Sequence, residues 1–157
     1  MHLEYFKLID RIVDLNLGEK TIHAEAVVPQ TSSIFEGHFP GHPLMPGVLL
    51  IEAMAQTSGW LVIALTRFER MPFLAAVKDA KLRTFVEPGQ ALSIAACLVH
   101  DGSGFAMTSA SIKRDGKPVC SAEITFRVMP FPDLSFRASM ERVATEISFP
   151  MRALADG

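Results

Sequence analysis

GHFPGHPLMPGVLLIEAMAQ, residues 37–56, is the stretch of sequence that decides the fold. Its first half belongs to a segment, residues 31–46, that holds three prolines and two glycines. Proline fixes φ and removes a backbone donor, so this segment predicts an ordered loop rather than a helix or an inner strand. Pro46 suits the first turn of a helix, where its missing N–H costs nothing. The second half therefore predicts the start of one long apolar helix that ends near Arg67.

Strand-like runs flank this helix on both sides. Residues 6–14 and 21–28 precede it, are rich in β-branched side chains and are separated by a turn at residues 16–19. Four further runs follow, punctuated by Pro-Gly and Asp-Gly sequences that form turns: residues 73–86, 91–99, 106–113 and 119–128. One helix among antiparallel strands predicts an α+β domain, residues 1–128, in which a curved sheet wraps around the helix.

The tail, residues 129–157, differs in pattern from the predicted domain. Two prolines break the last strand, and Asp133 then suits the N-cap of a helix. Apolar residues recur beyond it at helical spacing: Phe136, Met140, Val143 and Ile147. We expect one surface helix that packs on the domain or on a partner subunit.

Composition and charge exclude several classes of protein. The 157 residues fit one domain, and a formal net charge of −2 gives no overall attraction to nucleic acid or to an anionic membrane. Cys97 and Cys120 are too few for a disulfide framework, so we interpret them as reduced and buried. The first residues lack the apolar core of a signal peptide, and the long helix carries Glu52 and Gln56. We expect a soluble cytoplasmic protein without a membrane span.

Three features of the deciding stretch together suit acid–base chemistry. His38 lies in the proline-rich loop, and a histidine titrates near neutrality, which suits a general base. Glu52 lies among apolar neighbours, where an ionised carboxylate is costly, so it suits a general acid. The first N–H groups of the helix, at Gly47 and Val48, point at a site that favours negative charge and can stabilise an enolate. Such a set can remove water from a β-hydroxy carbonyl compound.

The same residues have plainer interpretations. His38 can be a loop histidine that bonds a backbone carbonyl, and Glu52 can be a carboxylate that a neighbour satisfies at a subunit interface. A zinc site that uses His38 and His42 is disfavoured, because Pro40 and Pro43 prevent helical i,i+4 geometry, so no metal is expected. On the residues alone these alternatives stay open.

The deciding stretch closely resembles the signature of the FabZ-type (3R)-hydroxyacyl-[acyl carrier protein] dehydratases. The resemblance rests on GHFPG, then P-x-MPGVL, then EAMAQ, in that order. It extends more weakly to YFKLIDRI at residues 5–12, to FLAAVKDAKLRTFVEPGQAL at residues 73–92 and to KRDGKPVCSAE at residues 113–123. About residues 5–128 are covered.

The resemblance implies a hot-dog fold, paired into a homodimer (alone or as a trimer of dimers) whose two active sites lie at the interface. It implies that His38 and Glu52 are the catalytic pair and come from opposite subunits, and that the Gly47 N–H binds the thioester carbonyl. The implied reaction converts a (3R)-3-hydroxyacyl thioester into the trans-2-enoyl product. The substrate is carried on the phosphopantetheine arm of acyl carrier protein, and no other cofactor is implied. The candidate substrate-binding residues are Gly47, Val48, Phe39 and Pro46.

Some features depart from the family pattern. The family's N-terminal helix and Pro-His-Arg segment are missing, and the tail after residue 128 is longer than in a minimal member. The family's basic-aromatic pair appears as Lys81-Leu82, and its Pro-Gly-Asp as Pro88-Gly89-Gln90. These last changes bear on tunnel shape and carrier docking. An acidic carrier needs basic contacts, for which Lys78, Lys81 and Arg83 are candidates, although all three can equally be solvated strand charges.

Other functions compatible with this fold remain as alternatives. A hot-dog acyl thioesterase does not need the loop histidine, so His38 argues against it. An isomerising dehydratase typically carries Asp at the helix position, so Glu52 argues against that branch. A non-catalytic acyl-binding protein gains nothing from both residues. The long helix is expected to line an acyl tunnel in an enzyme, whereas chain-length preference and pathway do not follow from the sequence.

Overall fold

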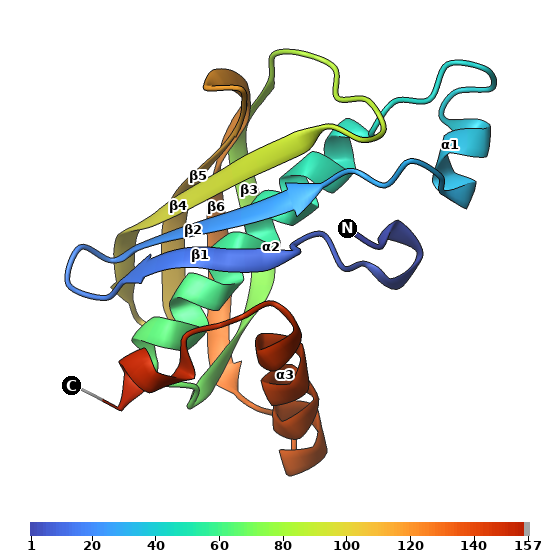
Figure 1. Ribbon diagram of the computed structural model, residues 1–157. Helices are drawn as coiled ribbons and strands as arrows, with labels where there is room; N and C mark the ends of the chain where they lie inside the picture. Colours follow the sequence, from blue (N-terminus) through green and yellow to red (C-terminus); the bar gives the residue numbers. More distant parts are fainter. Residues whose placement is uncertain (156–157) are drawn as a thin grey trace.

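The apolar run after Pro46 forms helix α2, Gly47–Leu65, with Pro46 as its N-cap. The helix begins where the sequence predicts and ends two residues before Arg67, where the chain enters left-handed backbone. The computed structural model describes residues 1–155 and places α2 inside a curved sheet (Figure 1). By length and composition alone α2 is able to cross a membrane, but 72% of the apolar window is buried inside the protein. Burial of this extent is typical of a core helix.

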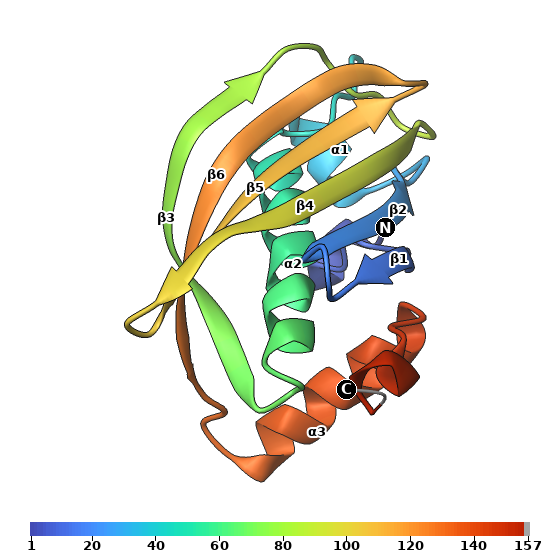
Figure 2. The same ribbon diagram turned by 90° about the vertical axis from the view of Figure 1, so that its left-hand side faces the viewer.

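The sheet has six antiparallel strands in the order β1-β2-β4-β5-β6-β3. Because β3 follows α2 yet pairs with the last strand, β6, the curved sheet wraps around the helix and stays open between β1 and β3, as Figure 2 shows. The strands are β1 (Arg11–Asn16), β2 (Thr21–Val27), β3 (Arg70–Leu82), β4 (Ala91–Gly102), β5 (Phe105–Arg114) and β6 (Lys117–Pro130). The predicted α+β architecture, with two strands before the helix and four after it, is confirmed.

The first strand is shorter than predicted. Residues 6–10 do not belong to it. A 3-10 turn, η1 (Leu3–Tyr5), comes directly before them, and Phe6 has left-handed backbone. Asp10 instead accepts hydrogen bonds from the N-terminal amine and from the backbone N–H of Val27. This side chain draws the start of the chain onto the end of β2, so β1 begins only at Arg11.

The prediction that residues 31–46 contain no helix is wrong for their first part. Helix α1, Ser33–Gly37, is one short turn, and the Ser32 side chain caps it by accepting from the backbone N–H of Ile34. All three prolines of the segment come after this turn, so its backbone donors are intact. The rest of the segment is the expected loop.

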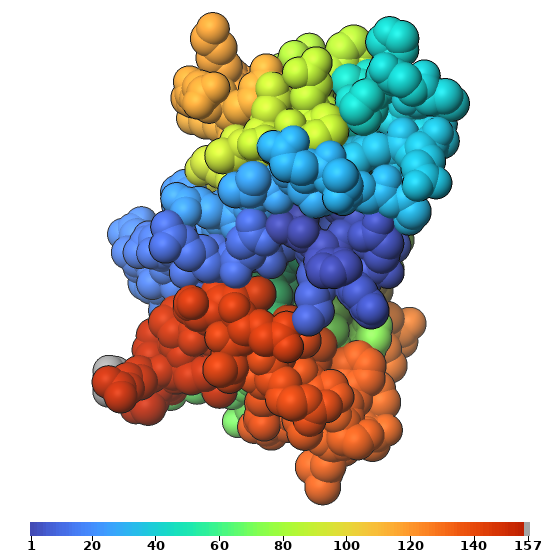
Figure 3. Space-filling view, turned by 45° about the vertical axis from the view of Figure 1, so that its right-hand side comes forward, coloured from blue at the N-terminus to red at the C-terminus, as the bar shows by residue number. Residues whose placement is uncertain are grey.

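The tail forms the predicted helix. Helix α3, Leu134–Glu146, begins at Asp133, whose carboxylate accepts from the N–H of Phe136, and a 3-10 turn, η2 (Met151–Leu154), follows it. The segment after α3 returns to the domain, where the backbone N–H of Ile12 donates to the carbonyl of Ile147 at 2.8 Å. Phe149 is buried against Trp60 of α2. The space-filling view shows this C-terminal segment against the N-terminal one, with α2 behind them (Figure 3).

Candidate active site

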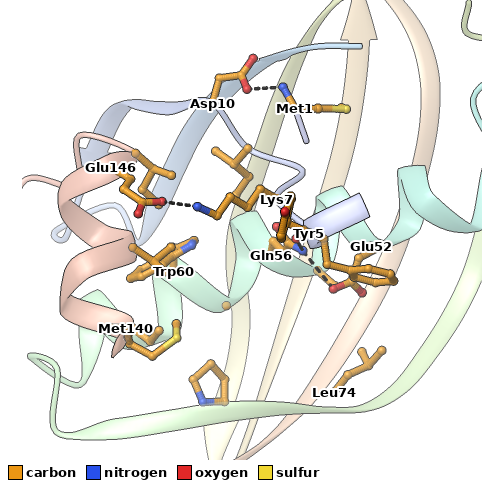
Figure 4. Close-up of a pocket in the computed structure, with 18 of the residues that line it drawn as sticks. Met1, Tyr5, Lys7, Asp10, Glu52, Gln56, Trp60, Leu74, Met140 and Glu146 are labelled. Atoms are coloured by element: carbon orange, nitrogen blue, oxygen red, sulfur yellow. Dashed lines mark hydrogen bonds and ion pairs between the residues drawn. The ribbon is translucent and has the colours of Figure 1, made fainter. Parts of the chain in front are cut away.

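A cavity of about 580 Å³ opens along the face of α2 that the sheet leaves uncovered. Its walls come from five parts of the chain: the N-terminal segment, α2, the start of β3, Phe126 of β6, and α3 with the residue after it (Figure 4). Most of the lining side chains are apolar, and Glu52 and Gln56 are the polar groups that α2 contributes. Ligand pockets typically have this size and a few polar groups in an apolar lining.

Glu52 is held by a hydrogen-bonded neighbour one helical turn away. Nε2 of Gln56 donates to Oε1 of Glu52 at 3.2 Å and to the carbonyl of Phe6 at 2.8 Å. Oε1 of Gln56 accepts from the N–H of Leu8 at 3.2 Å, so the backbone of the N-terminal segment orients the amide. Gln56 therefore fixes the carboxylate at the cavity. Gln56 is not among the functional residues that the sequence predicts, and its i,i+4 spacing from Glu52 is the signal that points to it.

His38 follows directly after α1 and is half-buried. Its Nδ1 lies 2.9 Å from the carbonyl oxygen of Leu44. A carbonyl only accepts, so Nδ1 is the donor, and in the neutral ring Nε2 then keeps the lone pair. The plainer interpretation of His38 expects a bond to a backbone carbonyl, and this bond is present. It also directs the N–H to Nδ1, which leaves Nε2 of the neutral ring as the nitrogen that can accept a proton. Phe39 stacks on the ring, with centroids 4.1 Å apart.

The loop that carries His38 is tied to the N-terminal segment through Glu4. Its Oε1 accepts from Oγ of Ser32 at 2.6 Å and from the backbone N–H of Ser33 at 2.9 Å. These bonds lower the pKa of Glu4 from 4.5 to about 2, and the bond from Ser32 has the largest effect. Glu4 is therefore ionised at neutral pH and holds the start of α1, at whose other end His38 lies. This contact was also missed in the sequence.

The start of α2 is close to the end of β3. A Cβ atom on Gly47 would lie 2.5 Å from Cδ1 of Leu82, so only glycine fits beneath this side chain as it stands. Val48 is exposed and Pro46 is buried. The first amides of a helix have no acceptor within it, so this end of α2 keeps its ability to bind a carbonyl oxygen.

One chain does not bring the two predicted catalytic residues into one cavity. Glu52 lines the cavity along α2, whereas His38 lies in the loop beyond α1 and is not among the lining residues. The candidate docking residues do not line this cavity either: Lys78 and Lys81 are exposed on β3, and Arg83, just beyond it, donates to Oγ of Ser121 at 3.2 Å.

The chain matches the model of the FabA-like domain family over residues 1–123. It is 38% identical over 122 residues to a protein of Ligilactobacillus salivarius named 3-hydroxyacyl-[acyl-carrier-protein] dehydratase FabZ, a match that covers 77% of this chain and 86% of that protein. A protein of Latilactobacillus sakei with the same name is 41% identical over 122 residues, covering 76% and 85%.

Solved structures share the fold at much lower identity. A hypothetical thioesterase from Streptococcus pneumoniae in complex with coenzyme A has a TM-score of 0.61 at 18% identity, over 78% of this chain and 88% of that one. The conserved protein PA5202 from Pseudomonas aeruginosa has a TM-score of 0.63 at 20% identity, over 80% and 91%. These matches confirm the hot-dog fold alone. The identity to curated relatives goes further: the chain belongs to the FabA-like family and, within it, to the FabZ-type 3-hydroxyacyl-[acyl carrier protein] dehydratases.

Proposed function

We propose that this protein is a hydro-lyase that removes water from (3R)-3-hydroxyacyl-[acyl carrier protein] and forms the trans-2-enoyl product in fatty-acid or related lipid biosynthesis. One observation carries the proposal. Glu52, oriented by Gln56, faces a largely apolar cavity in a chain whose relatives at 38–41% identity are named as dehydratases of this kind. A thioester with a long alkyl chain needs such a cavity beside its acid–base groups.

The roles of the two residues follow from their contacts. Nε2 of His38, left with its lone pair by the Leu44 bond, takes the proton from C2 of the substrate. The electron pair of that C–H bond forms the C2=C3 double bond as the C3–O bond breaks. Glu52 donates its proton to the leaving hydroxyl, which departs as water. The N–H groups of Gly47 and Val48 bind the thioester oxygen and stabilise its negative charge.

The reaction needs a homodimer, because one chain does not place His38 in the cavity of its own Glu52. Strand β3 supplies an edge for pairing: among the described residues β6 is its one neighbour in the sheet, and apolar side chains along it are exposed, among them Leu74 (51%) and Val77 (37%). Pairing of two β3 strands joins the two sheets and brings the His38 loop of each subunit toward the other subunit's cavity. No cofactor beyond the carrier's phosphopantetheine is required for this chemistry.

Acyl carrier protein is the proposed partner, and the protein is proposed to act in the cytoplasm. Lys78 and Lys81 are exposed on β3 and Arg83 just beyond it, where they can meet an acidic carrier. A charge reversal at Lys81 is expected to raise KM for the carrier-bound substrate more than for the same acyl group on pantetheine.

Turnover of (3R)-hydroxyacyl-[acyl carrier protein], read by mass spectrometry, tests the reaction. Wild type is expected to form the enoyl product, while His38→Ala and Glu52→Gln lose about 10²–10⁴-fold in rate. Release of free acid by wild type would favour a thioesterase instead. No turnover across chain lengths would leave a binding protein.

Subunit mixing tests whether the site is shared. Each variant is inactive alone, but a mixed dimer of His38→Ala and Glu52→Gln subunits carries one intact site if the two residues act across the interface. Half of randomly assorted dimers are mixed, so about a quarter of wild-type activity is expected to return. If both residues act within one chain, no activity returns.

A further inference from the structure

We propose that helix α3 closes the far end of the acyl-binding cavity and thereby limits the length of the acyl chain. The inference rests on the proposed dehydratase function and assigns a role to the part of the chain beyond the family match, which ends at residue 123. It makes α3 a specificity element of the site rather than a surface addition.

The cavity leads from the acid to this helix without a break. It begins at Glu52, follows α2 past Gln56 and Gly59 to Trp60, and meets apolar side chains that α3 and the residue after it turn inward: Met140, Val143 and Ile147. Figure 4 shows Met140 and Trp60 at the end of the cavity opposite Glu52. An alkyl chain that starts at Glu52 therefore runs into α3.

Several contacts anchor α3 as a fixed wall. Nζ of Lys7 lies 2.7 Å from Oε2 of Glu146, which ties the end of α3 to the N-terminal segment. The segment after α3 is fastened to β1 through the N–H of Ile12 and the carbonyl of Ile147, 2.8 Å apart. Beyond it, the rings of Phe149 and Trp60 lie 5.3 Å apart between centroids. A longer acyl chain must displace this wall to enter.

The helical spacing gives the length of chain that fits. Trp60 lies eight residues after Glu52, a rise of about 12 Å along the helix at 1.5 Å per residue. An extended alkyl chain advances roughly 1.3 Å per carbon, the projection of a C–C bond of about 1.5 Å. About nine carbons beyond the one that bears the hydroxyl therefore reach the wall, which corresponds to an acyl group of about a dozen carbons.

Gly59 and Pro72 border the cavity where it runs between α2 and β3, and the size of residue 59 affects its width there. A Cβ atom at this position would lie 3.6 Å from Cγ of Pro72, in ordinary contact across the gap between α2 and β3. The Gly59→Ala methyl group therefore fits the fold, and alanine is the better helix former. The same methyl group narrows the route that the acyl chain takes toward α3.

The experiment compares kcat/KM for the 3-hydroxybutyryl, 3-hydroxydodecanoyl and 3-hydroxyhexadecanoyl thioesters of acyl carrier protein. Wild type is expected to accept dodecanoyl far better than hexadecanoyl substrate. Met140→Ala removes part of the wall, so the ratio of kcat/KM for hexadecanoyl to that for dodecanoyl substrate is expected to rise about tenfold or more. One methylene group in an apolar pocket changes kcat/KM by about this factor. Met151→Ala is the matched control, because Met151 lies in the same extension but does not line the cavity.

Gly59→Ala is the second variant, and it tests the route without weakening the helix. It is expected to lower the dodecanoyl-to-butyryl ratio about tenfold while the melting temperature is maintained. If Met140→Ala and Gly59→Ala both leave the ratios at the values of Met151→Ala, or if wild type accepts hexadecanoyl as well as dodecanoyl substrate, the inference is overturned and the dehydratase proposal stands. If wild type dehydrates none of the three substrates, the dehydratase proposal fails and the inference with it.

Discussion

Replacement of Phe149 by alanine tests whether the C-terminal extension is an integral part of the domain. The ring is 5% exposed, and its centroid lies 5.3 Å from that of Trp60 and 6.0 Å from that of Phe68. Truncation of a phenylalanine buried to this extent costs about 3–5 kcal/mol of unfolding free energy, because the transfer energy is lost and a cavity remains. In a chain of this size, 1 kcal/mol shifts the melting temperature by about 2–4 °C. The expected fall is therefore roughly 6–20 °C.

Urea unfolding at a fixed protein concentration measures the loss directly. The concentration is held constant because the stability of a dimer depends on it. The midpoint is expected to fall while the slope m is unchanged, since the surface exposed on unfolding stays the same. Leu134→Ala, at a residue of α3 that is 84% exposed, is the control and is expected to stay within about 0.5 kcal/mol. A Phe149→Ala midpoint as close to wild type as this control would refute the packing of the extension on α2.

Three further predictions concern pairing, acid stability and thiol reactivity. Val77→Lys places a charge on the open edge of β3, so sedimentation is expected to show monomer and turnover to fall with the dimer fraction. Because the pKa of Glu4 is lowered from 4.5 to about 2, its stabilising effect is complete above pH 4.5 and is lost as the pH falls through 2. Acid unfolding of Glu4→Gln is expected to lack this part of the pH dependence. Burial raises the pKa of Cys120 from 9.0 to about 11, so in Cys97→Ser the remaining thiol should resist dithiobis(nitrobenzoate) at mildly alkaline pH and react only after unfolding.

The elements that the sequence predicts well are those in which local chemistry and burial agree. Helix α2 combines a proline at its start with an apolar run, and the turns after β3, β4 and β5 carry a glycine with positive φ, at Gly89, Gly104 and Gly116. Asp133 begins α3 as predicted because a capping carboxylate acts on its own neighbours. Such signals are local, so no knowledge of the tertiary structure is needed to interpret them.

The errors lie where a distant residue decides the local structure. The predicted first strand fails before Arg11 because Asp10 bonds the N-terminal amine and Val27. The turn of α1 has its local cap at Ser32, but Glu4 holds that cap from a segment far away in sequence. Neither contact has a periodic pattern along the chain.

The candidate site divides in the same way. His38, Gly47 and Glu52 can be proposed from the sequence because they lie close together in a motif of unusual composition, and their roles stay a prediction. Gln56 was missed because its role depends on the backbone of Phe6 and Leu8, which only the fold brings to α2. The tail was predicted as a helix that covers the surface, but amphipathic spacing does not say which cavity its apolar face closes.

The two edges of the sheet explain how one chain is prepared for a shared site. The C-terminal segment contacts the outer strand β1, where the Ile12 N–H donates to the carbonyl of Ile147, so this edge is partly covered. Strand β3, at the other edge, is more than twice as long and exposes apolar side chains. An edge of this kind promotes pairing with another chain. The cavity of Glu52 is bordered by the start of this same strand, at Met71, Pro72 and Leu74. In the dimer that we propose, a second subunit pairs beside this border of the cavity. Helix α3 packs on the same part of β3, with the rings of Phe136 and Phe73 6.4 Å apart between centroids. Pairing at β3 and the length limit proposed for α3 therefore act on neighbouring walls of one cavity.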